Sequence, residues 1–247
     1  MRIVFLGTNG WFNTGTGNTP CVLVETEDYY IVFDAGDGIY KLDRYIKSDK
    51  PIYIFLSHFH LDHLSGLHIL NKFRFKQGLR LYGQKGTKVI LHHILAHPLS
   101  VPLEDLPTKL NISELTEGTH RIPFRLTCKL LLHADPCFGY RVVSNGKVIA
   151  YCTDTGICEN SLKLARNADV LIHDCAETSG ARTSEWPHST PVEAATLAKE
   201  ANVRQLILFH FSAAVYQSIE DRKKAKADAK VVFKNTIASV DGMEITF

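Results

Sequence analysis

The sequence predicts an α/β protein in which two β-sheets pack face to face and helices lie outside them. Short apolar runs of strand-like composition alternate with segments of helical periodicity along all 247 residues. The first half of the chain loosely resembles the second half, because each has strands followed by a crossover helix. The sequence contains no Pro/Ser-rich linker and no low-complexity block, so a single domain over residues 1–247 is expected.

Strands are predicted where short apolar runs are bounded by turn residues, at 2–6, 21–26, 30–34, 52–56, 79–82, 122–133, 138–143, 147–152, 169–173, 205–209, 231–233 and 243–247. Helices are predicted where apolar residues recur with helical spacing, at 38–47, 63–73, 86–96, 159–166, 191–201 and 217–228. Asn145-Gly146 is typical of a tight hairpin turn. The irregular region 97–120 is expected to be a loop, either a surface connection or a functional rim.

The composition is that of a soluble globular protein, with 45% hydrophobic and 22% charged residues. A net charge of +2 argues against a strongly basic nucleic-acid binder. No apolar stretch approaches the roughly 20 residues that a membrane span needs. The six cysteines include no C-x-x-C pair, which predicts reduced thiols in a cytoplasmic protein.

One short run, Ser57-His58-Phe59-His60-Leu61-Asp62-His63, directly follows the predicted strand 52–56. Imidazole and carboxylate groups are ligand types that suit zinc and its first-row neighbours. In an extended chain His58 and His60 point to the same side, and a turn after Leu61 can present Asp62 and His63 to a second ion. This density of ligand-type side chains indicates a metal site rather than scattered surface histidines.

Three further candidates each sit just beyond an apolar β-run, namely His133, Asp154 and His210. Sites in layered α/β proteins are typically built from loops at strand ends, where the sheet fixes the side chains. Any one of the three alone would be read as structural. As a set they indicate the rest of a metal centre.

The motif His58-x-His60-x-Asp62-His63 resembles the signature of the metallo-β-lactamase superfamily, and the segment Val32-Phe33-Asp34-Ala35-Gly36 is similar to its early strand end. The resemblance implies an αββα sandwich and two divalent ions, with zinc expected and manganese or iron as alternatives. It implies His58, His60 and His133 on one ion, Asp62, His63 and His210 on the other, Asp154 bridging, and Asp34 orienting a ligand. Two such ions lower the pKa of a bridging water, so hydrolysis is the expected reaction. Asp62 is also a candidate to orient that water.

The prediction of the substrate class rests on His188. Thr190, Pro191 and Glu193 are capping signals for a helix, but capping does not explain the histidine before them. A helix N-terminus favours an anion such as phosphate, so an imidazolium there needs a carboxylate partner. Asp174, at the end of the strand 169–173, is the expected partner. Such an Asp–His pair can donate a proton to a leaving alkoxide.

This pair resembles the ribonuclease Z branch of the superfamily, as do the segments Phe5-Leu6-Gly7-Thr8, Cys152-Thr153-Asp154-Thr155-Gly156 and Leu208-Phe209-His210-Phe211-Ser212. Three features depart from that branch. Its tRNA-gripping arm is replaced by the short stretch 142–153, its arginine after the last metal histidine is absent, and Asp174 stands where it has Glu. We therefore expect a small or exposed phosphodiester substrate, such as a cyclic nucleotide or an oligonucleotide or RNA end.

Three alternatives remain open at this point: tRNA 3′ processing of the ribonuclease Z type, hydrolysis of an ester or lactone, and a regulatory protein that binds metal without turnover. A homodimer is expected by analogy with proteins that resemble this one. The glycine-rich segment 7–18 lacks a P-loop ending, so a flexible turn is expected there rather than a substrate contact. The basic run 222–226 is expected to be a solvated helix face.

Overall fold

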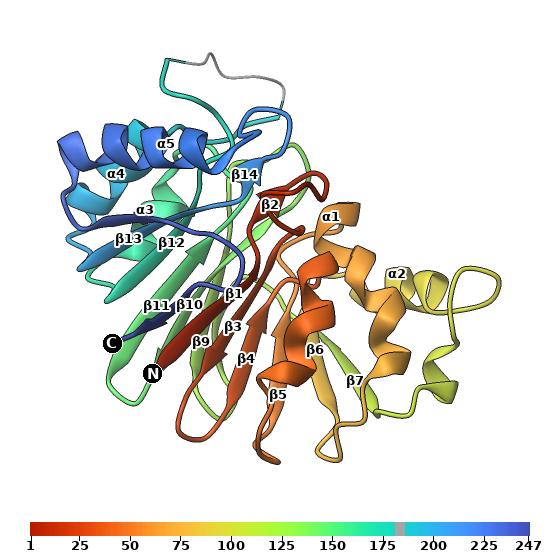
Figure 1. Ribbon diagram of the computed structural model, residues 1–247. Coiled ribbons are helices and arrows are strands. Elements are labelled where there is room, and N and C mark those ends of the chain that lie inside the picture. Colours follow the sequence, from red (N-terminus) through yellow and green to blue (C-terminus); the bar gives the residue numbers. More distant parts are fainter. Residues whose placement is uncertain (181–185) are drawn as a thin grey trace. The chain divides into compact units, whose positions relative to one another are not determined.

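The computed structural model describes residues 1–180 and 186–247 (Figure 1). Contacts within the chain define two compact units. Unit 1 comprises Met1–Gly7, Asn18–Thr116 and Asp241–Phe247, and unit 2 comprises Thr8–Gly17 and Glu117–Val240. Each unit contains a seven-stranded mixed sheet with helices, which confirms the predicted α/β class with two sheets.

The sheet of unit 1 has the spatial order β16 (Glu244–Thr246), β1 (Arg2–Gly7), β3 (Cys21–Glu25), β4 (Tyr30–Phe33), β5 (Ile52–Phe55), β6 (Leu79–Gly83) and β7 (Leu110–Glu114). Neighbouring strands are antiparallel from β16 to β4 and parallel from β4 to β7. Every residue of β4 and β5 is buried, as the near-continuous apolar sequences of central parallel strands predict.

The helical segments of unit 1 are short: η1 (Asp37–Arg44), α1 (Leu61–Leu64), η2 (Ser65–Lys72), α2 (Thr87–Ile94) and η3 (Leu103–Asp105), where η marks a 3₁₀-helix. Ile39 of η1 and Leu67 of η2 share a core cluster with Val32 and Ile54 of the sheet. Burying this apolar surface fixes the segment after β5, which carries the histidine run.

The sheet of unit 2 has the spatial order β15 (Thr236–Ala238), β13 (Gln205–Phe209), β12 (Val170–Asp174), β11 (Lys147–Cys152), β10 (Phe138–Ser144), β9 (Arg125–Leu130) and β8 (Gly118–Arg121). Strands β11, β12, β13 and β15 are parallel, so their carboxyl ends lie at one edge. A separate parallel pair joins β2 (Asn9–Gly10) to β14 (Phe211–Ser212).

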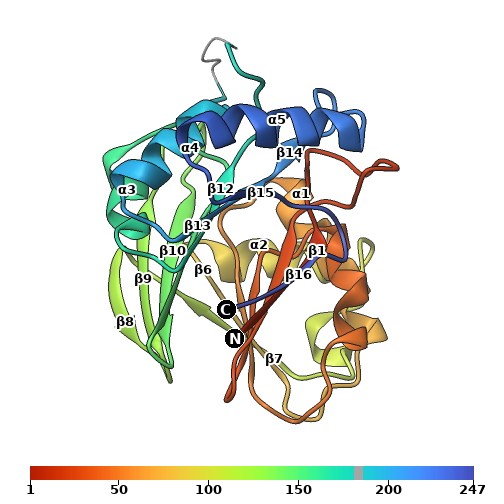
Figure 2. The ribbon, with the colours of Figure 1, turned by 60° about the vertical axis from the view of Figure 1, so that its left-hand side comes forward.

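Three helices, α3 (Glu159–Ala165), α4 (Pro191–Glu200) and α5 (Ile219–Val232), belong to unit 2 (Figures 1 and 2). Each begins with a capping box, and the one at Thr190 and Glu193 of α4 confirms the capping signal in the sequence. Leu164, Leu197 and Ala225 of these helices share one core cluster with Leu171 and Leu206 of the sheet.

The predictions for 231–233 and 97–120 are wrong. The strand predicted at 231–233 is absent, because α5 continues to Val232 and the strand β15 begins only at Thr236. The capped helix and its buried alanines override the β-propensity of the two valines. The expected loop 97–120 contains β7 and most of β8, because alternating half-buried and exposed residues pair there as strands at the sheet edges.

Among the residues that the structure describes, no helix combines the length and hydropathy required to cross a membrane.

Candidate metal centre

The histidine run of unit 1 folds into a tight group of imidazoles. β5 ends at Phe55, and His60 is the N-cap of α1, whose first turn carries Asp62 and His63. The ring of His58 lies 4.3 Å from that of His60 and 4.3 Å from that of His63, centroid to centroid. His58 and His63 are fully buried. The three imidazoles thus form one group of nitrogen donors, a ligand type that suits a divalent cation.

Asp34 orients one of these histidines. It follows β4, and its buried carboxylate accepts hydrogen bonds from the Ser57 amide (2.7 Å) and the Ser57 hydroxyl (3.0 Å). Asp34 Oδ2 also lies 2.9 Å from His63 Nδ1. This contact assigns the proton to His63 Nδ1 and leaves Nε2 as the ligand atom, which lies 3.4 Å from Asp62 Oδ2. The geometry is the one expected for the positioning role of Asp34.

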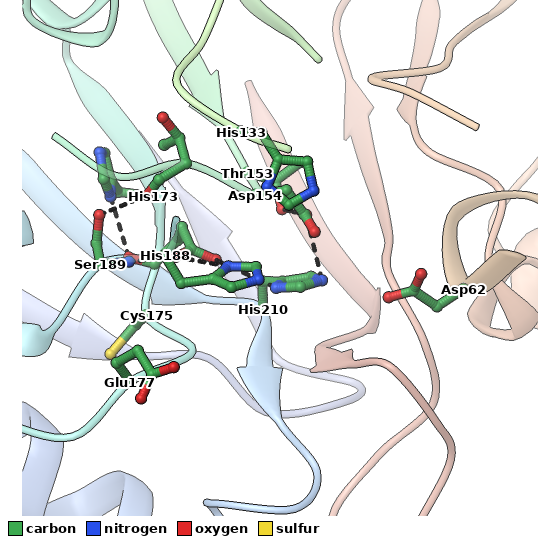
Figure 3. A network of polar contacts seen from close by, with 12 residues as sticks. Asp62, His133, Thr153, Asp154, His173, Cys175, Glu177, His188, Ser189 and His210 are labelled. Carbon is green, nitrogen blue, oxygen red and sulfur yellow. Dashed lines mark hydrogen bonds and ion pairs between the residues drawn. The ribbon is translucent and has the colours of Figure 1, made fainter. Parts of the chain in front are cut away.

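The ends of the central strands of unit 2 bring Asp154 and His210 together. Asp154 follows β11 and His210 follows β13, with β12 between them. His210 Nε2 lies 3.2 Å from Asp154 Oδ1 (Figure 3). Both residues are buried, and both adopt left-handed backbone, with φ of 49° at Asp154 and 58° at His210. Such conformations are costly and concentrate at functional sites.

Asp174 of β12 forms the predicted contact with His188 and a second contact that the sequence did not predict. Its Oδ1 lies 3.1 Å from Nδ1 of His188 and 3.1 Å from Nδ1 of His210, and the Ser189 amide donates to its Oδ2 (2.7 Å). The two imidazoles are stacked, with centroids 5.6 Å apart and planes 16° apart (Figure 3). One buried carboxylate therefore orients both rings.

The charges at this pair shift both pKa values. Burial alone raises the pKa of Asp174, but His188 and His210 outweigh it and lower this pKa to about 2. Burial lowers the pKa of His188, but the Asp174 carboxylate outweighs it and raises this pKa. The two groups thus stabilise each other as a carboxylate and an imidazolium.

His133 is half-buried just beyond β9. An antiparallel bridge between Leu132 and Gly156 ties its segment to the loop that carries Asp154. The His133 ring lies 5.4 Å from that of His188 and 6.2 Å from that of Trp186. In unit 2 the predicted ligands His133, Asp154 and His210 are thus held by neighbouring segments.

Comparisons with known proteins agree with this geometry. Residues 29–211 match the model of a β-lactamase superfamily domain. Ribonuclease Z of Bacillus licheniformis is 30% identical to this chain, with 99% of the chain and 98% of the relative covered. Ribonuclease Z of Methanosarcina mazei is 29% identical, with 99% and 97% covered. The metallo-β-lactamase fold protein YhfI of Bacillus subtilis superposes with a TM-score of 0.81 at 21% identity, over 99% of this chain and 98% of that one.

The chain belongs to the β-lactamase superfamily, in its ribonuclease Z-like branch. It is accordingly a metal-dependent hydrolase that acts on phosphodiesters. Human tRNase Z, short form, shares the fold, with a TM-score of 0.79 at 24% identity over 100% of this chain and 99% of that one.

The donors of this ribonuclease Z-like chain fit a divalent cation. In unit 2, ligand atoms of Asp154, His188 and His210 lie within 4.8 Å of one another. In unit 1, the imidazoles of His58, His60 and His63 are in ring contact. Imidazole and carboxylate donors suit zinc, manganese and iron. His188 is in ligand reach as well as in contact with Asp174, which the sequence did not indicate.

Gly10 is a site residue that the sequence reasoning missed. A Cβ atom added there would lie 2.5 Å from Cε1 of His210, so only glycine fits against that imidazole. The glycine-rich composition of residues 7–18 was the available signal. It did not indicate which glycine contacts His210, because His210 lies near the other end of the sequence.

The hairpin where ribonuclease Z would carry its arm is tight. β10 and β11 pair from Tyr140–Tyr151 to Ser144–Lys147, and Asn145 and Gly146 turn with φ of 51° and 72°. This confirms the predicted hairpin and leaves no room for an arm between residues 142 and 153. The alignment with the Methanosarcina relative extends over 304 positions whereas this chain has 247 residues, so the relative contains segments without a counterpart here.

Proposed function

We propose that this ribonuclease Z-like hydrolase cleaves a small or exposed phosphodiester, such as a cyclic nucleotide or an oligonucleotide end, with His188 as the proton donor. The observation that carries the proposal is the position of Asp174, whose Oδ1 lies 3.1 Å from both His188 and His210. A single buried carboxylate thus places a proton-transfer group directly beside a predicted metal ligand.

The proposed ligands are the seven residues predicted from the sequence. His58, His60 and His133 would hold one ion, Asp62, His63 and His210 would hold the other, and Asp154 would bridge. Zinc is the proposed metal, since histidine and carboxylate donors dominate the set. When bound, two such ions polarise the phosphoryl group and supply an activated water near neutral pH. Asp62 is proposed to orient that water in addition to binding metal.

The protein's own residues prepare the departure of the leaving group. Asp174 accepts the hydrogen of His188 Nδ1, which leaves Nε2 as the atom that can give a proton to an alkoxide. The Ser189 amide fixes the carboxylate, and burial keeps water from competing for it. A donor of this kind assists the departure of a poorly acidic alcohol, such as the sugar hydroxyl released from a nucleotide phosphodiester.

The tight β10–β11 hairpin argues for a small substrate. Gripping a folded RNA requires an extended basic surface, and the family's arm is replaced here by a two-residue turn. The serine and alanines after His210 offer no cation in place of the family's arginine. A compact phosphodiester needs neither feature.

Ribonuclease Z-type tRNA 3′ processing is the second candidate. It is favoured by the names of the relatives, which are 29–30% identical over nearly the whole chain. We propose a cytoplasmic location for both candidate functions, since free thiols such as the six in this chain are typical of the cytosol. A homodimer is likewise proposed by analogy alone.

The test compares substrates on metal-loaded protein. Phosphodiesters with good and poor leaving groups, a lactone and a precursor tRNA are assayed side by side, and metal content is measured per chain. We expect turnover of the phosphodiesters and two ions per chain. Preference for the lactone would overturn the main proposal, and specific tRNA cleavage would promote the second candidate.

His188→Ala tests the proton donor. General acids typically accelerate a reaction roughly a hundred- to ten-thousand-fold, so turnover of a phosphodiester with a poor leaving group should fall by that factor. Turnover of a para-nitrophenyl phosphodiester, which has a good leaving group, should fall by much less. His92→Ala, an exposed histidine on α2, is the matched control. Equal losses for the two leaving groups would exclude His188 as the proton donor.

A further inference from the structure

A pair of exposed aromatic side chains lies on the segment that joins β2 to the rest of unit 2. Trp11 is 69% exposed and Phe12 is 42% exposed, and their rings meet edge to face with centroids 5.2 Å apart. Leaving two large aromatic side chains in water forgoes their burial energy, so this pair calls for a functional explanation.

Trp11 also adopts a costly backbone conformation, with φ of 75°. A bulky residue at positive φ is a genuine outlier. In the part of the chain that the structure describes, the residues at positive φ that are neither Gly nor Asn are Trp11, Asp34, Asp154 and His210. Trp11 therefore shares its strain with three residues of the candidate metal centre.

The segment is held in place by hydrogen bonds, contrary to the flexible turn expected from the sequence. The side-chain amide of Asn9 donates to the carbonyl oxygens of Phe12 (3.1 Å) and Gly17 (3.0 Å) and to Thr14 Oγ1 (3.0 Å). These bonds close the loop around Trp11 and maintain its conformation.

Arg222 of α5 anchors the same segment. It was expected on a solvated helix face, but it is only 1% exposed, whereas Lys223 and Lys224 are solvated as expected. Its guanidinium donates to Thr8 Oγ1 (2.8 Å) and to Asn9 Oδ1, and it lies 4.6 Å from the ring centroid of Phe211. A buried cation tied to the loop makes the position of the aromatic pair rigid.

The aromatic pair begins beside a predicted metal ligand. β2 pairs with β14, directly after His210 (Figure 1), and the Phe211 amide donates to the Thr8 carbonyl (3.0 Å). Gly10 packs so closely on the His210 imidazole that a Cβ atom would lie 2.5 Å from it. Trp11 is the next residue after this contact.

We propose that Trp11 and Phe12 form a stacking platform for an unpaired nucleobase next to the phosphodiester that is cleaved. Two adjacent aromatic rings offer a surface on which any base can stack through its π-face. Tyr40 is another exposed aromatic residue, and cations of Lys41 and Arg44 lie 5.3 and 5.8 Å from the centroid of its ring. This inference rests on the proposed phosphodiesterase function and specifies its substrate as a nucleotide with an accessible base.

A fluorescence experiment tests the platform without turnover. The chain has two tryptophans, so in a Trp186→Phe variant Trp11 is the sole tryptophan, and its emission is read with selective excitation of tryptophan. Adenosine monophosphate should quench its emission saturably, and ribose phosphate should not. Quenching by neither ligand, or equally by both, would overturn the proposal.

Kinetics with matched substrates gives the second readout. Thymidine monophosphate para-nitrophenyl ester and methyl para-nitrophenyl phosphate share a leaving group, but only the first has a base. Stacking is worth roughly 5- to 150-fold in affinity, so Trp11→Gly should raise KM by that factor more for the first ester than for the second. Tyr40→Ala, an exposed aromatic in unit 1, should leave the ratio of the two KM values unchanged.

Trp11→Gly is also expected to fold, because glycine adopts positive φ without strain. Its Tm should stay unchanged or rise by about 2–4 °C. If the wild-type protein cleaves neither ester, the proposed function fails and the fluorescence titration alone decides the platform. If it cleaves both and Trp11→Gly leaves the KM ratio unchanged, the platform fails while the phosphodiesterase function stands.

Discussion

Replacing Asp174 by Asn should damage metal binding and proton donation together. Oδ1 of Asp174 lies 3.1 Å from Nδ1 of both His188 and His210, and Oδ2 accepts from the Ser189 amide at 2.7 Å. Asparagine has a single acceptor oxygen. If that oxygen faces the imidazoles, the new NH₂ group meets the Ser189 N–H, and if it faces Ser189, the NH₂ group meets both imidazoles.

Either orientation leaves a buried donor without an acceptor and removes the charge that held the rings. Such a loss costs about 2–5 kcal/mol of the free energy of unfolding, which corresponds to a Tm lower by roughly 5–15 °C. Residues that orient metal ligands typically contribute 10- to 100-fold to metal affinity, so metal binding should weaken by about that factor.

Two measurements check the Asp174→Asn prediction: thermal unfolding, and competition for zinc with a chelating dye. Asp43→Asn, an exposed carboxylate paired with Lys72, is the control. His188→Ala should reduce turnover at nearly unchanged metal affinity, which separates the two contacts of Asp174. Wild-type metal affinity and wild-type turnover in Asp174→Asn would refute the reasoning.

Two further predictions concern Gly10 and the cysteines. Gly10→Ala places a Cβ atom 2.5 Å from His210 Cε1, so zinc affinity should fall about 10- to 100-fold in the dye competition, whereas Gly15→Ala, with nothing within 4 Å, should match wild type. Cys158 alone among the six cysteines is not buried, and burial raises the pKa of the Cys152 and Cys175 thiols. Alkylation of the native protein should therefore modify Cys158 alone, and mass spectrometry should detect one label per chain. Labelling of a buried cysteine at a similar rate would contradict that prediction.

Features that are local in the sequence were predictable. The run from His58 to His63 places four predicted ligands within six positions, and Asp154 and His210 each lie just beyond an apolar strand. Helix capping accounts for Thr190, Pro191 and Glu193 at the start of α4 but not for His188, so His188 could be recognised as a functional candidate.

Features made by contacts between distant segments were not predictable. Gly10 meets His210, and Arg222 meets Thr8 and Asn9, across most of the chain length, so periodicity and composition carried no sign of either contact. The second contact of Asp174, with His210, arises because β12 lies beside β13, which no local pattern reveals. The edge strands β7 and β8 were missed because half-exposed alternation is a weaker signal than a buried apolar run.

The left-handed backbone at Asp34, Asp154 and His210 has a consequence for recognising inactive descendants of such an enzyme. In a homologue that has lost its activity, selection no longer maintains these three side chains. The backbone must still adopt the left-handed conformation at the same three positions for the chain to fold. Asn and Gly adopt that conformation most cheaply. We therefore expect inactive homologues to carry Asn or Gly at these positions, and to keep the backbone conformation of the site after its functional side chains are lost.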